Sequence, residues 1–129
     1  MKLKQSGYRI ITSVLNFAAI RLNKGGVCIF TRETIHCSEI NLNNFCKEKD
    51  LEICAIELHL QFYKICIMTI YRSPSGDFQY FINTLEIILS KIQSDFNDTI
   101  LCGDFNINYY KKLHFETIFG LIDNLVWFI

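Results

Sequence analysis

The residues best suited to chemistry lie in one short segment, Gly103-Asp104-Phe105-Asn106. Asp104 and Asn106 are two residues apart at the end of an apolar run, so we expect their side chains to leave the same side of a strand. The carboxylate could orient or deprotonate water, and the amide could donate to an anionic oxygen or hold the carboxylate in place. Gly103 would let a substrate backbone approach closely, and Phe105 would point into the core.

A phenol and a guanidinium end a second apolar run. Tyr71 and Arg72 are followed directly by the loop Ser73–Asp77, which we expect to push both side chains out at the rim of a sheet. If this strand and the Asp104 strand have the same ends together, four polar groups converge there. Such a set suits a phosphate and the water that attacks it. Taken alone, Asp104 and Asn106 favour an Asx-type turn, and that interpretation remains an alternative.

Four apolar segments predict the strands that would position these groups. Val27–Thr31 is a short β-prone run that follows a turn at Gly25-Gly26. Glu52–Leu60 alternates between apolar and polar residues, and Lys64–Tyr71 is almost wholly apolar, so the two should pair as an antiparallel hairpin. Thr99–Cys102 is a further buried strand, and the polar segment with Asp104 follows it.

A helix is predicted between the last two of these strands. Phe78–Ile92 repeats apolar residues at three- and four-residue steps, with Ser75 or Gly76 as its cap and Asp77 in its first turn. The tail, Phe115–Ile129, fits either a helix or a strand. Because strand, helix and strand follow one another, we expect a helix packed on a sheet and a mixed α/β or α+β fold.

The composition is that of one folded domain. The chain has 129 residues, half of them apolar, and its 13 basic residues balance its 13 acidic ones. These values exclude a disordered chain, and the neutral charge gives no overall electrostatic argument for nucleic acid. We expect no membrane span and no secretion signal. The six cysteines are predicted to be reduced structural thiols of an intracellular protein, with disulfide or metal binding as the alternatives.

Four segments together resemble the endonuclease/exonuclease/phosphatase superfamily, and most nearly the apurinic-type endonuclease domain of non-LTR retrotransposons. The segments are GGVCIFTRE (25–33), ICAIEL (53–58), IYRSPSGDFQYFI (70–82) and ILCGDFNIN (100–108). The resemblance implies a two-layer α/β sandwich of mixed sheets with flanking helices. It also implies a partial, truncated domain over residues 7–129 that follows an N-terminal tail of residues 1–6.

The resemblance further implies a function. The family cleaves phosphodiester bonds with a divalent metal, commonly Mg²⁺, and its retrotransposon branch nicks target DNA to prime reverse transcription. By position, Asp104 would orient and activate the attacking water, and Asn106 would help to place the water and the phosphate. Tyr71 would contact the phosphate or the leaving group, and Arg72 is a further candidate phosphate contact. DNA is then the expected partner, within a longer reverse-transcriptase polyprotein, and the expected location is nuclear.

The sequence departs from the family pattern at both ends. The family's first Asn and its metal-binding Glu belong before the region that resembles it from Tyr8, and its closing Asp-His pair belongs after the last residue. We therefore expect little or no nuclease activity and assign no metal ligand. One alternative is a non-catalytic remnant or interaction module on the same scaffold. A less favoured one is a relative of the superfamily's sphingomyelinases or inositol phosphatases.

Overall fold

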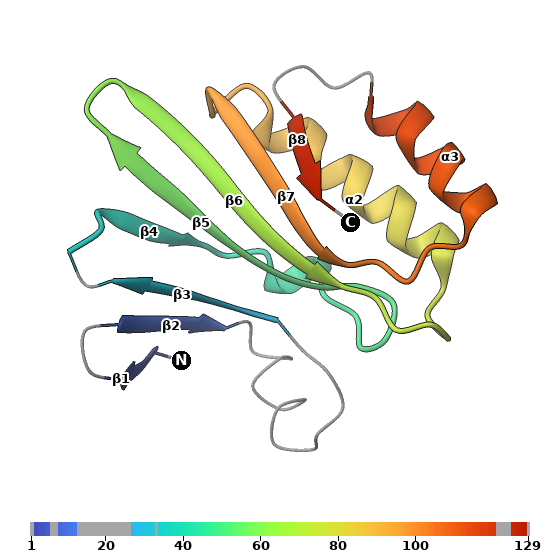
Figure 1. Cartoon of the computed structure of the whole chain (residues 1–129), viewed down its shortest axis with the longest axis horizontal. Helices are drawn as coiled ribbons and strands as arrows, with labels where there is room; N and C mark the ends of the chain where they lie inside the picture. The colour runs from blue at the N-terminus through green and yellow to red at the C-terminus, as the bar shows by residue number, and fades with distance from the viewer. Residues whose placement is uncertain (1, 6–7, 13–26, 33, 121–124, 129) are drawn as a thin grey trace.

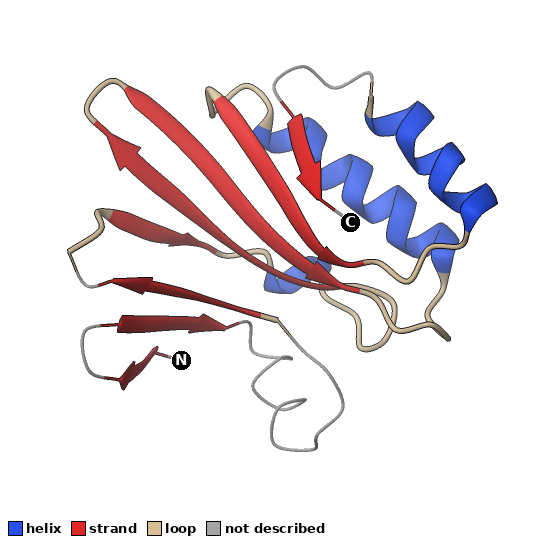
Figure 2. Ribbon diagram, viewed as in Figure 1, coloured by secondary structure: helices blue, strands red, loops and turns tan. Residues whose placement is uncertain are grey.

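The computed structural model describes residues 2–5, 8–12, 27–32, 34–120 and 125–128, which form two sheets and two long helices (Figures 1 and 2). The first sheet is antiparallel, in the order β1 (Lys2–Gln5), β2 (Tyr8–Thr12), β3 (Cys28–Arg32). The second has the order β4 (Cys37–Ile40), β5 (Glu52–Leu60), β6 (Tyr63–Tyr71), β7 (Asp98–Asp104), β8 (Leu125–Phe128). The helices are α2 (Phe78–Ile92), α3 (Tyr109–Phe119) and the short 3₁₀ helix η1 (Asn43–Phe45). The chain is therefore a mixed α+β protein, as predicted.

The central strands follow the sequence pattern closely. Strands β5 and β6 pair antiparallel over their whole length, so the predicted hairpin is confirmed. Strand β7 then pairs parallel with β6. A parallel neighbour needs a crossover connection, and α2 provides it, lying against the sheet in Figure 1. This connection places the ends of β6 and β7 at the same edge of the sheet.

Helix α2 has the predicted bounds but a different cap. Asp77 is its N-cap residue, and its carboxylate accepts a hydrogen bond from the Tyr80 backbone N–H at 3.0 Å. The cap expected at Ser75 or Gly76 was therefore placed too early. The Asp77 backbone N–H donates to the Asp50 carboxylate at 2.7 Å, which ties the helix start to the loop before β5. That contact between distant segments holds the residue that caps the helix in place.

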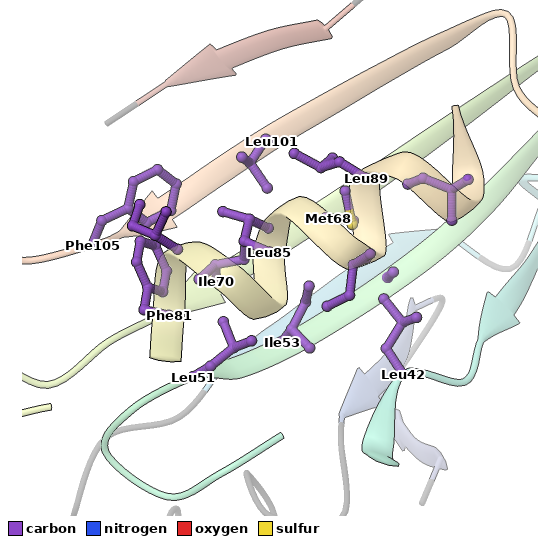
Figure 3. Close-up of a cluster of buried hydrophobic side chains, with 14 of the residues drawn as sticks. Leu42, Leu51, Ile53, Met68, Ile70, Phe81, Leu85, Leu89, Leu101 and Phe105 are labelled. Carbon is purple, nitrogen blue, oxygen red and sulfur yellow. The ribbon is translucent and has the colours of Figure 1, made fainter. Parts of the chain in front are cut away.

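The main core lies between α2 and one face of the second sheet, as Figure 3 shows. Phe81, Leu85 and Leu89 of the helix are buried there. They pack against apolar side chains of β5, β6 and β7: Ile53, Met68, Ile70 and Leu101. The opposite face of the sheet carries a smaller cluster in which Cys54 and Ile56 meet Val27, just before β3. The second sheet is thus covered on both faces.

The ends of the chain were less predictable. Residues 2–5, expected as part of an N-terminal tail, form β1 and pair with β2. In the ambiguous tail, β8 occupies Leu125–Phe128, so the strand alternative holds there, whereas α3 already ends at Phe119 and residues 121–124 lie outside the described residues. The turn at Gly25-Gly26 lies outside the described residues. None of the six cysteines, all of which the structure describes, is in a disulfide bond. None of the helices within the described ranges is long and apolar enough to cross a membrane.

Candidate functional site

Tyr71 and Asp104 lie side by side at one edge of the second sheet. They are paired residues in the parallel ladder of β6 and β7, so the two strands have the same ends together, which was the condition for these polar groups to converge. Paired residues on strands about 4.8 Å apart point to the same face of a sheet. That face is the one opposite the helices, because Tyr71 packs against the small cluster around Val27 and Cys54. A phenol and a carboxylate therefore share one rim.

A pocket of about 340 Å³ lies over this rim. Its walls come from the start of β3 and the ends of β6 and β7: Val27, Cys28, Thr69, Ile70, Tyr71, Gly103 and Asp104. Asp104 is exposed, whereas Tyr71 and Cys28 are half-buried. Burial raises the pKa of the Cys28 thiol, which keeps it neutral. Asp104 is therefore the charged group at the pocket. The volume of the pocket is near the lower end for small-molecule sites.

Asn106 does not continue the strand. Its φ of 49° is in the left-handed region, and β7 ends two residues earlier. Its backbone N–H donates to Asp104 Oδ1 at 3.3 Å, which is the Asx-type turn considered above. Its amide Nδ2 donates to the carbonyl of Arg72. The side chains of Asp104 and Asn106 thus do not leave one face of a strand, because the turn directs the amide toward the end of β6.

Gly103 makes room for the neighbouring strand and not, as expected, for a substrate. Its φ is 143°, a backbone conformation that side-chain-bearing residues rarely adopt. A Cβ atom at this position would lie 1.9 Å from the carbonyl oxygen of Ile70. The close approach of β6 and β7 at the rim therefore requires glycine here. Phe105 is fully buried, which confirms its predicted place in the core.

Arg72 is buried, with only 3% of its surface exposed. The expected position at the rim is therefore wrong, and so is the phosphate contact that depended on it. Its guanidinium donates to backbone carbonyls of the neighbouring loops. Burial lowers the pKa of Arg72, while the negative charges of Asp104 and Asp50 favour its cationic form. This burial cannot be predicted from the order of the residues, because two of the three carbonyls that replace water come from a distant segment.

Sequence reasoning missed Glu52, which is paired with Tyr71 on the other side, in β5. It is 1% exposed, and its Oε2 has no hydrogen-bond partner among the described residues. Burial, and then the charge of Glu48, raise its pKa. The signal that could have found it is an acidic residue at the start of a largely apolar strand, Glu52–Leu60. Glu52, Tyr71 and Asp104 thus form one row across three strands.

The described residues do not by themselves fit the expected Mg²⁺. Across those residues, no group of three or more His, Cys, Asp or Glu side chains could hold a metal ion. Asp104 offers one exposed carboxylate, and Glu52 is buried two strands away with Tyr71 between them. A hard divalent cation needs more oxygen ligands in one place than this row provides. No chemical step of the site is therefore assigned to a metal.

Comparisons of the chain with family models, curated proteins and solved structures gave no match. The chemistry of the rim can then be argued only from its geometry. A phenol O–H at Tyr71 can donate to an anionic oxygen, and the carboxylate at Asp104 can accept a proton or orient water. Because both face one pocket, they can act on the two sides of a single substrate group.

Proposed function

We propose that this rim binds a phosphodiester group of DNA, and that the chain is an endonuclease domain of the retrotransposon type within the endonuclease/exonuclease/phosphatase sandwich. The observation that carries the proposal is the parallel pairing of Tyr71 with Asp104 at the mouth of one pocket. The segments that resemble the superfamily include both residues, together with Gly103 between the two strand ends. The resemblance and the geometry thus support the same pair.

In the proposed reaction, each side chain has a separate task. The Tyr71 hydroxyl donates a hydrogen bond to a non-bridging phosphate oxygen or to the leaving oxygen. The Asp104 carboxylate accepts a hydrogen bond from the attacking water and takes up its proton. Asn106 acts on the geometry of Asp104 through the turn, because its own amide is engaged by the Arg72 carbonyl. This differs from the direct contact with water and phosphate that the resemblance implied.

We expect this activity to be weak. The described residues provide no metal-binding group. The histidines His36, His59 and His114 do not line the pocket, so no described imidazole is placed to share the proton transfer. Removing members of a catalytic set commonly costs several orders of magnitude in rate. The activity to measure is therefore slow nicking of one DNA strand. Supercoiled plasmid detects it sensitively, because a single nick relaxes the whole molecule.

The test compares three chains on supercoiled plasmid with Mg²⁺: the unchanged protein, Asp104→Ala and the control Asp95→Ala. Asp95 is exposed and lies beyond α2, before the start of β7. We expect slow nicking that Asp104→Ala abolishes and Asp95→Ala retains. Equal nicking by all three would mean that the rim does not cut DNA. If the protein cleaves phospholipid head groups but not DNA, its substrate is a phospholipid, as for the superfamily's lipid-cleaving members, and the proposed DNA substrate is wrong.

The second candidate is a DNA-binding module without catalysis, which the missing metal group favours. The same phenol and pocket would then contact a phosphate without cutting it. Fluorescence anisotropy of a labelled duplex distinguishes the two candidates. Binding that Tyr71→Ala weakens and Tyr110→Ala does not, with no nicking by the unchanged chain, would establish the module. Tyr110 is a suitable control because it is exposed on α3 and does not line the pocket.

A further inference from the structure

Arg72 joins three segments of the chain immediately behind the rim. Its Nε donates to the carbonyl of Phe105 at 2.8 Å, its Nη1 to that of Gly76 at 2.8 Å, and its Nη2 to that of Asn106. Its backbone N–H donates to the carbonyl of Asp104 at 2.9 Å. The amide of Asn106 donates back to the Arg72 carbonyl. The ends of β6 and β7 are thus tied in both directions.

We propose that Arg72 is the positioning residue of this site: it holds Asp104 and the following turn in line with Tyr71. The proposal rests on the function proposed above, to which it adds a residue that touches neither substrate nor water. A guanidinium suits the task because its donors are fixed in one plane and point in different directions. A lysine ammonium carries all its donors on one nitrogen, so it cannot reach the carbonyl of Gly76 and those of Phe105 and Asn106 at once.

The surroundings of the guanidinium favour positioning over a general contribution to the core. Two of its three hydrogen-bond partners are the carbonyls of Phe105 and Asn106, the turn that directly follows the rim residue Asp104, and the backbone N–H of Arg72 donates to the carbonyl of Asp104 itself. The central carbon of the guanidinium lies 5.5 Å from the ring centre of Phe78 and 5.8 Å from that of Phe81. These two rings at the start of α2 hold the plane of the guanidinium in place. Asn106 is in the left-handed conformation, which carries a free-energy cost that these bonds offset.

The experiment measures amide hydrogen exchange by NMR in the full chain. It compares the unchanged protein with Arg72→Lys, Arg72→Ala and the control Arg32→Met. Arg32 is exposed at the opposite end of β3 from the pocket. If Arg72 positions the rim, exchange at residue 72 and Asn106 should speed up about tenfold or more in Arg72→Lys, the effect of losing one such bond. Exchange at Met68, in the middle of β6, should change much less.

A uniform increase in exchange at the rim and at Met68 would overturn the proposal, because Arg72 would then stabilise the fold as a whole. Rescue adds a second test. Methylguanidinium should restore slow exchange at Asn106 in Arg72→Ala, whereas methylammonium should not. Failure of this rescue in a folded variant also counts against the proposal. If exchange changes locally but the unchanged protein neither binds nor nicks DNA, the positioning role stands and the proposed function fails. Arg32→Met should leave exchange at the rim unchanged.

Discussion

Replacing Gly103 with alanine should destabilise the rim more than any other single methyl addition among the described glycines. The new Cβ would lie 1.9 Å from the Ile70 carbonyl oxygen, where ordinary contacts begin near 3.4 Å. Relief requires β6 and β7 to separate, which weakens two or three ladder hydrogen bonds at about 1 kcal/mol each. The φ of 143° adds about 1–3 kcal/mol for a residue with a side chain. Together these terms predict a loss of about 3–6 kcal/mol in the free energy of unfolding.

Urea unfolding followed by circular dichroism measures this loss directly. Gly120→Ala is the matched control, because Gly120 has a helical φ of −66° and caps the end of α3. Its new Cβ would meet the Glu116 carbonyl oxygen at 2.7 Å, so the last turn of α3 must also shift, but no strand has to separate from its neighbour. We expect the control to cost less than Gly103→Ala. Equal unfolding midpoints for the two variants would refute the steric account of Gly103.

Two further variants test a buried charge and a helix cap. Because burial raises the pKa of Glu52, its contribution to the free energy of unfolding is fully present below pH ~4.3 and is lost as pH rises through the folded pKa. Between pH 5 and 7 the melting temperature should therefore fall more for the unchanged protein than for Glu52→Gln, and parallel curves would contradict this. Asp77→Ala should cost about 1 kcal/mol of stability because it removes the cap of α2. Ser75→Ala should cost less, and a larger effect at Ser75 in thermal unfolding would return the cap to its earlier predicted position.

The sequence determined the elements that build the rim. The alternation over Glu52–Leu60 and the apolar stripe over Phe78–Ile92 gave a strand and a helix with the bounds that the structure has. One helix between two buried strands is a connection that allows parallel neighbours, and the parallel pairing in the structure brings Tyr71 and Asp104 to one edge. These conclusions depend on local periodicity and on connection lengths, both of which are present in the order of the residues.

Tertiary structure alone decided what each polar group at the rim contacts. Arg72 directly precedes a polar loop in the sequence, but it is buried because carbonyls 33 and 34 residues away accept its hydrogen bonds. Gly103 leaves room for the carbonyl of Ile70, and the backbone N–H of the capping residue Asp77 donates to Asp50 in a distant loop. Hydrogen bonds between distant segments leave no periodic trace in a sequence. The row of Glu52, Tyr71 and Asp104 became visible only when the register of three strands was known, since a shift of one residue would turn each side chain to the other face.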